Sequence, residues 1–352
     1  EFGYWSYAAR LAGYDWSDIA SLGSYYSYGY SLILLPVFVI FKSGIAAYRA
    51  AMFVNFALLA ACFFILQKMG KTFCAAVAVF YPTWLFYAGT TFAETLLVTL
   101  YLVICLSFLK YLQTNKRQYL ALMLITMLYM YCVHRRAIGV LVSGILVLLI
   151  YSVRRGGKKV KYALVLITGL AFVFAAGLLI TNYWTSLMHA AAEDGLKNIN
   201  SYAGQIRKIL AVFTKEGFIN LMISVSGKIL YLGWASFGLA YFGLAYTIKR
   251  VREKKYFPLF VLLSTLAALM ISAIYTIYPG RVDTLTYGRY HEYVMPVLIM
   301  MGIKELRKKS MSARGTASGI AVMIVLEAAL TWMVTISLRR YVSVRLVIVP
   351  IA

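Results

Sequence analysis

The sequence has few of the residues that a water-soluble domain needs on its surface. Of its 352 residues only 12 are Asp or Glu, and 13% are charged. A hydrophobic content of 62% and a mean hydropathy of +0.78 are too high for one water-soluble globule. The four cysteines lie in apolar stretches, so neither a disulfide framework nor a zinc site is indicated. The composition predicts an integral membrane protein.

Long apolar runs take the place of the missing charge. Several have about the twenty residues that a helix needs to cross roughly 30 Å of hydrocarbon, and the alternating pattern of a membrane barrel is absent. The sequence therefore predicts an all-α polytopic bundle with about ten transmembrane helices. The expected spans are 45–66, 72–90, 94–110, 119–134, 137–153, 162–182, 226–248, 257–279, 287–303 and 316–338.

Basic residues are concentrated in short loops between these spans. More than half of the 35 Lys and Arg residues lie in five of them. The loops are Lys68 with Lys71, "KYLQTNKRQ", "RRGGKKVK", "KRVREKK" and "KELRKKSMSAR". The positive-inside rule places such loops in the cytoplasm. The net charge of +23 therefore reflects topology, and no nucleic acid partner is expected.

The first 44 residues are expected to form an aromatic, acidic external loop. Its apolar stretch 28–41 contains Pro36 and is expected to lie at the outer membrane surface, because a crossing there would put the basic loops outside. With Glu1 outside, an upstream transmembrane helix is expected. The predicted organisation is an external loop 1–44, a transmembrane domain 45–338 with an external loop 183–225, and the start of an external C-terminal segment, 339–352.

The outward-facing polar residues are the candidates for chemistry. The ring of Tyr4 suits stacking on a sugar, although aromatic residues also form belts at membrane interfaces. Asp15 lies in the same loop. Glu94 opens a span, where the helix dipole favours a carboxylate, and it is also a candidate metal ligand or partner for ionic groups of a substrate.

Two further motifs place positive charge on the external side. Arg135 and Arg136 in "CVHRRAIG" suit bidentate phosphate recognition, and contact with lipid headgroups is the alternative. The motif "YGRYHEYVMP" sets Arg289 before a helix, where it either holds an anionic group or pairs with Glu292 three residues on.

The order of these motifs resembles the GT-C glycosyltransferase superfamily, the polyprenyl-phosphate-sugar-dependent enzymes that include the bacterial aminoarabinose transferase and the protein O-mannosyltransferases. "EFGYWSYAARLAG" is similar to the family's segment that begins with an Asp-Glu pair, read from its second acid. "FYPTWLFYAGTTFAETLL" places Glu94 where the family has an acid at the start of a helix. "VHRRAIGVL" and "YGRYHEYVMPVLIMMG" resemble the family's later basic motifs.

This resemblance implies an inverting sugar transfer at the extracytoplasmic face of a bacterial cell membrane. The donor would be a polyprenyl-phosphate-linked sugar, and the acceptor a hydroxyl of a glycan, lipid or protein. Glu1 and Glu94 are the implied catalytic residues. The Asp that acts as the catalytic base in the family would precede Glu1. Glu94 is also a candidate ligand for a divalent metal, Mg, Mn or Zn. The implied substrate-binding residues are Tyr4, Asp15, Arg135, Arg136, Arg289, Tyr290 and His291.

Two other functions fit the same topology. A flippase or transporter of lipid-linked sugars is favoured by Glu327 in the middle of a span, since intramembrane acids mark proton pathways. The internal repeats typical of transporters are not evident. An O-antigen ligase or polysaccharide polymerase would use a large late external loop, for which 183–225 is the candidate.

Overall fold

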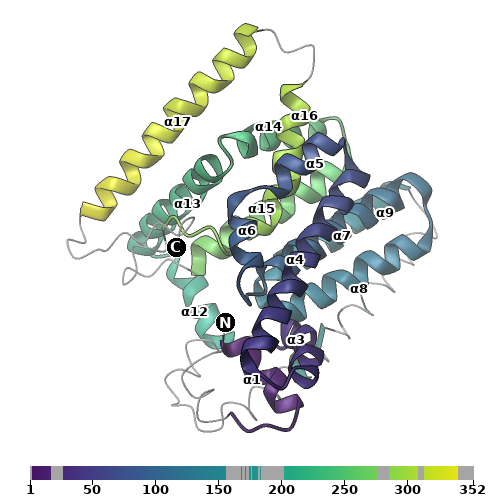
Figure 1. Ribbon diagram of the computed structural model, residues 1–352. Coiled ribbons are helices and arrows are strands. Elements are labelled where there is room, and N and C mark those ends of the chain that lie inside the picture. Colours follow the sequence, from purple (N-terminus) through teal and green to yellow (C-terminus); the bar gives the residue numbers. More distant parts are fainter. Residues whose placement is uncertain are drawn as a thin grey trace. The chain divides into compact units, whose positions relative to one another are not determined.

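The computed structural model describes residues 2–16, 27–155, 202–275, 285–307 and 313–339, with some helical positions between 168 and 183. These residues form helices, turns and irregular segments, and no strand occurs among them (Figure 1). The predicted all-helical class is confirmed for this part of the chain. Glu1, most of the expected span 162–182 and the tail beyond 339 lie outside the described residues.

The chain divides into two compact units. The first comprises 1–65 and 84–205, and the second 66–83 and 206–352. The helices of the first unit are α1 (Phe2–Leu11), α3 (Gly29–Ile40), most of α4 (Gly44–Met69), α7 (Glu94–Thr114), α8 (Arg117–Val133), η1 (Arg135–Ala137) and α9 (Ile138–Arg155). The helix α6 (Pro82–Ala88) falls at the division between the units.

The second unit holds the later helices together with α5. Its elements are α5 (Thr72–Val79), α13 (Lys215–Ala235), α14 (Leu239–Arg252), α15 (Tyr256–Tyr275), η3 (Glu292–Val294), α16 (Met295–Leu306) and α17 (Ala313–Arg339). The helix α12 (Tyr202–Ala211) precedes α13. Within this unit α16 packs against both α14 and α5, and α17 packs along α13 (Figure 1).

Six described helices are long and apolar enough to cross a membrane. They are Gly44–Met69, Glu94–Thr114, Arg135–Arg154, Lys215–Ala235, Tyr256–Tyr275 and Ala317–Thr335. The helices Gly29–Ile40 and Arg117–Val133 are apolar but shorter. The membrane class predicted from composition therefore agrees with the structure, whereas the expected ten spans are not confirmed.

Two of the expected spans are interrupted, and a third, 287–303, becomes α-helical only at Met295. The run 72–90 forms two short helices, because Pro82 lacks a backbone N–H and disfavours helical backbone at Tyr81. The run 226–248 is broken after Ala235, where Phe237 and Gly238 have φ of 51° and 78°. Its helix also begins earlier, at Lys215, because the Thr214 hydroxyl accepts the N–H of Gly217 at 3.0 Å and caps the helix within the predicted loop 183–225.

The short helix α3 is held in the first unit by its N-terminal end. A Cβ atom on Gly29 would overlap the backbone of Cys132 and Val133, so only glycine permits this approach of α3 to α8. The Tyr129 hydroxyl donates to the Gly29 carbonyl at 3.0 Å. The Tyr28 hydroxyl bonds to Cys132 Sγ at 3.3 Å, and burial raises the pKa of Tyr28. These contacts hold the N-terminal end of α3 against α8.

Candidate functional site

Three helices of the first unit bring their ends to one place. The helix α7 begins at Glu94, α8 ends at Val133, and Arg136 lies in η1 directly before α9. The opposite ends of the same three helices carry Lys110, Lys116, Arg117, Arg154 and Arg155. One end of this group is therefore basic, and the other holds the acid that sequence analysis selected.

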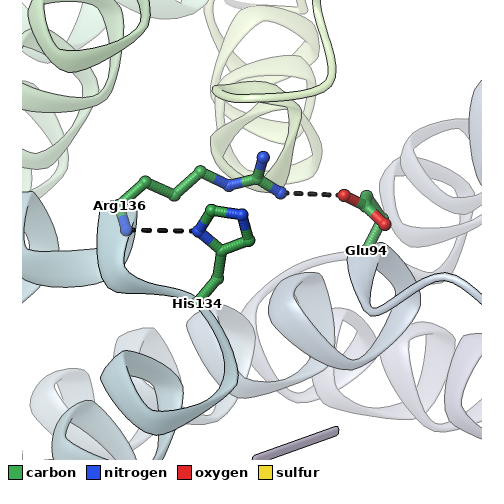
Figure 2. A network of polar contacts seen from close by, with 3 residues as sticks. All are labelled: Glu94, His134 and Arg136. Carbon is green, nitrogen blue, oxygen red and sulfur yellow. Dashed lines mark hydrogen bonds and ion pairs between the residues drawn. The ribbon is translucent and has the colours of Figure 1, made fainter. Parts of the chain in front are cut away.

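Glu94 and Arg136 form a buried ion pair at that end (Figure 2). The Arg136 Nη2 donates to Glu94 Oε1 at 2.9 Å, and the two side chains are 5% and 2% exposed. Charges are kept out of water only where they are paired and hydrogen-bonded, so each side chain depends on the other. The pair fixes one edge of the planar guanidinium in space.

His134 holds the backbone from which Arg136 projects (Figure 2). Its Nδ1 accepts the backbone N–H of Arg136 at 3.2 Å, which caps the short helix η1. A neutral histidine that accepts at Nδ1 carries its proton on Nε2. Arg135 follows His134 and is half-buried. The motif that predicted a phosphate site is thus a rigid turn with one arginine held by Glu94.

The first helix is fastened to the turn that leads into Glu94. The Trp5 indole N–H donates to the Thr91 hydroxyl at 3.0 Å, three residues before Glu94. The Ser31 hydroxyl donates to the Tyr4 carbonyl at 2.6 Å, and the rings of Tyr4 and Tyr30 meet edge to face at 5.2 Å. The aromatic opening segment therefore packs on α3 and on the approach to α7.

Asn55 joins three segments beneath this contact. Its Oδ1 accepts the Tyr30 hydroxyl at 3.1 Å, and its amide group donates to the Thr90 carbonyl at 2.6 Å. Asn55 and Tyr30 are both completely buried. Because these bonds connect α3, α4 and the turn before α7, they hold the segments around Glu94 in one arrangement.

The other predicted residues of the first loop lie in different environments. Tyr4 is completely buried in the packing between α1 and α3. Asp15 is exposed and forms an ion pair with Arg10 at 3.5 Å. A substrate would reach Asp15 directly, whereas Tyr4 would have to change its packing to stack on a sugar.

The motif "YGRYHEYVMP" contributes to a second buried cluster, in the second unit. The hydroxyls of Tyr231 and Tyr81 both lie within hydrogen-bonding distance of Glu292 Oε1 and are 3.1 Å from each other. Because each hydroxyl has one hydrogen, two of these three contacts are hydrogen bonds at any one time. The ring of His291, which is completely buried, meets Tyr231 edge to face at 5.5 Å. The Lys228 ammonium, also fully buried, donates to the Tyr287 carbonyl at 3.0 Å.

Two glycines let this motif lie tightly against α13. A Cβ atom on Gly288 would overlap the ring of Tyr231, and one on Gly227 would overlap the carbonyl of Leu285. Arg289 and Tyr290 follow Gly288 and are half-buried, and Tyr290 packs edge to face on Tyr275 and Tyr287. Glu292, which sequence analysis considered as a partner for Arg289, lies within hydrogen-bonding distance of two tyrosine hydroxyls.

Sequence reasoning missed three members of this cluster. Tyr81 and Tyr231 are two tyrosines among 29, and nothing in the sequence separates them from the rest. Lys228 did give a signal, because it is a cation inside an apolar helix long enough to span a membrane. Such residues are rare and mark functional or tightly paired positions.

Glu94 is also the predicted ligand of a divalent metal. Its Oε1 is bonded to Arg136, and no group of three or more His, Cys, Asp or Glu side chains suited to a metal occurs in the part of the chain that the structure describes. The divalent metal expected at Glu94 stays a prediction, and no chemical step below depends on it.

The fold and the two clusters define a helical membrane protein that buries ionisable groups near the ends of its apolar helices. Comparison of the chain with protein-family models, curated proteins and solved structures gives no match. Its activity has to be inferred from its own residues.

Proposed function

We propose that the protein is a membrane glycosyltransferase that moves a sugar from a polyprenyl-phosphate donor to an acceptor hydroxyl with inversion. The observation that carries the proposal is the buried Glu94–Arg136 pair, which presents a fixed guanidinium at the end of three helices. Arginine in a fixed orientation suits a phosphate, because its planar guanidinium can donate two parallel hydrogen bonds to the phosphate oxygens.

The charge distribution supports an extracytoplasmic site. In the first unit the end opposite Glu94 is basic, as the positive-inside rule requires of a cytoplasmic end. The second unit repeats this polarity. Lys304 donates to the Met69 carbonyl at 3.2 Å and Arg307 lies over the ring of Phe73, whereas Tyr81 and Glu292 lie at the other ends of α5 and α16. Both clusters would then face outward from a bacterial cell membrane.

In this mechanism Arg136, with Arg135 beside it, holds the donor phosphate. Glu94 acts as a positioning residue. Its carboxylate accepts a hydrogen bond from the Arg136 guanidinium and so fixes the orientation of that guanidinium. A preorganised cation stabilises the negative charge that develops on the leaving phosphate. Arg289, Tyr290, His291, Tyr4 and Asp15 remain the candidates for binding the sugar and the acceptor.

The reaction itself needs a base and a leaving group. A carboxylate takes the proton of the acceptor hydroxyl, whose oxygen attacks the anomeric carbon, and the bond from that carbon to the phosphate oxygen breaks with inversion. Such base catalysis contributes about 10² to 10⁴ in rate. The resemblance assigns this role to the acidic pair that ends in Glu1, which lies outside the described residues.

A flippase of lipid-linked sugars is the second candidate, because Glu327 lies within an apolar helix. A Cβ atom on Gly233 of α13 would overlap the Glu327 carboxyl group, so the acid points toward α13 rather than away from it. This is the placement expected of a functional intramembrane acid. A polysaccharide polymerase or ligase has no specific contact in its favour among the described residues.

The test is to reconstitute the protein into vesicles loaded with a labelled polyprenyl-phosphate sugar and candidate acceptors. The proposal expects label on the acceptor, and loss of it in Glu94→Gln but not in Glu327→Gln. Donor that crosses the bilayer without reaching an acceptor, with movement abolished by Glu327→Gln, would instead establish the flippase.

A further inference from the structure

The helix α12 turns a cation toward the protein and apolar side chains away from it. Lys208 is buried, and its ammonium lies 4.2 Å from the centre of the Tyr275 ring at the end of α15. The opposite side of α12 and of the turn that continues it carries an apolar stripe of exposed residues, Ile206, Ile209, Leu210 and Phe213. A helix on the surface of a water-soluble protein packs such a stripe against the core. The reversed orientation suits apolar surroundings.

Contacts at the turn after α12 fix this orientation. From Ile206 on, the helix belongs to the second unit. The Thr214 hydroxyl donates to the Ala211 carbonyl at 2.8 Å, and a Cβ atom on Gly217 would overlap that carbonyl. Val212 packs into the core that α13 and α15 share. The stripe therefore stays outward as long as α12 is folded against α13 and α15.

The apolar stripe continues into a surface that faces lipid. Phe218, Ile219 and Met222 are exposed in the first turns of α13, and both α13 and α15 are long and apolar enough to cross a membrane. The ten residues of α12 are about 15 Å long, half of the roughly 30 Å that a crossing requires. A short helix at the ends of two spans, with its apolar side outward, is typical of a helix that lies in the plane of the membrane interface.

The charges around α12 indicate which interface this is. The basic segment 249–255 joins α14 to α15 and lies at the other end of α15 from Tyr275. The positive-inside rule places that segment in the cytoplasm and α12 at the outer surface. Arg207 is exposed at the border of the apolar stripe, where a long side chain can extend its charge to the headgroups.

We propose that α12 lies in the outer interface of the bilayer, with its apolar stripe among the acyl chains and Arg207 at the level of the headgroups. The inference goes beyond the proposed function and does not depend on it. It assigns the end of the predicted external loop 183–225 to the membrane surface. Because the Tyr275 ring under Lys208 also meets Tyr290 edge to face at 5.2 Å, the anchored helix supports the segment that carries Arg289.

The test is electron paramagnetic resonance of nitroxide labels on the full chain in nanodiscs, with oxygen as the lipid-soluble relaxing agent and nickel EDDA as the water-soluble one. Labels at Ile209→Cys and Phe213→Cys should lie about 5–10 Å below the headgroups. A label at Arg207→Cys should be shallower than both. Phe53→Cys, exposed on the span α4, and Lys116→Cys, exposed in a basic loop, supply the lipid and water references.

Two results would overturn the interfacial helix. One is collision with nickel EDDA at both stripe positions as frequent as at Lys116→Cys, which would place the stripe in water. The other is slow collision with both agents, which would mean that a second copy or another segment of protein covers the stripe. Each label replaces an exposed side chain and the two stripe positions are measured separately, so the result does not depend on one variant. The assay contains no sugar donor, so failure of the transfer reaction leaves its outcome unchanged.

Discussion

Glu94 and Arg136, 42 residues apart in the sequence, form a buried ion pair of 2.9 Å where α7 begins and α8 ends. Both side chains are almost completely removed from solvent. Along α7 the next charged residue after Glu94 is Lys110, and α8 carries no charged residue after Arg117. The pair is therefore separated from the basic far ends by uncharged helix.

Removal of one partner of this pair should be strongly destabilising. Arg136→Met leaves Glu94 as a buried charge, and we expect a loss of about 3–5 kcal/mol in the free energy of unfolding. The double variant Glu94→Gln with Arg136→Met should recover part of this loss, because no charge is then left without its partner. Denaturant unfolding in micelles measures each variant, and losses that simply add would contradict a direct pairing.

Gly29 should tolerate no side chain. Gly29→Ala places a Cβ atom against the backbone of Cys132 and Val133, which cannot rotate away as a side chain can. We expect α3 to separate from α8, with a loss of about 1–3 kcal/mol in stability. Gly44→Ala, whose Cβ atom would meet nothing within 4 Å, is the matched control. Equal thermal midpoints for the two variants would rule out this close approach.

The two ends of the helices should lie on opposite sides of the membrane. A cysteine at Tyr14, which is 50% exposed, should react with a membrane-impermeant thiol reagent added to intact cells. A cysteine at Gln113, which is exposed in the last turn of α7 next to the basic loop, should react only after the membrane is opened. The native cysteines give little background, since three are buried and Cys132 is half-buried. Labelling in the reverse order would show that the Glu94 end of the first unit faces the cytoplasm.

The exposed pair Arg250–Glu253 should make the thermal stability of the protein depend slightly on pH in the acidic range. The hydrogen bond from Arg250, 2.6 Å long, lowers the pKa of Glu253 below its ordinary value of 4.5. Its stabilisation is therefore present above pH 4.5 and is lost as the pH falls through the lower folded value. Glu253→Gln should remove this dependence, measured as the thermal midpoint against pH. A variant whose midpoint falls as steeply as that of the unaltered chain would contradict the assignment.

Hydropathy was sufficient to predict the helical class and most of the helix positions, because apolar runs of this length have few other structures available to them. It failed at the interruptions. Pro82 and Gly238 are visible in the sequence, but each lies inside an apolar run whose length favoured a single span. Local backbone chemistry ended those helices, and hydropathy does not report it.

The candidate site was predictable only in part. Glu94 and Arg136 were each selected, because a charge at the end of an apolar run is unusual, yet nothing in the sequence indicated that they bond to each other. The Tyr81–Tyr231 contact joins residues 150 positions apart and was not predictable at all. Charge can be read from the sequence position by position, whereas contacts between neutral hydroxyl groups depend on packing.

The most direct test of the account is the rate of sugar transfer from a polyprenyl-phosphate donor by two matched sets of variants. Glu94→Gln and Arg136→Lys change the buried pair, and Glu253→Gln and Arg250→Lys make the same replacements in the exposed pair. We predict a loss of roughly 10²-fold or more in turnover for the first set, at equal amounts of folded protein, and normal turnover for the second. Turnover that is the same in both sets would contradict a transfer site at Glu94 and Arg136.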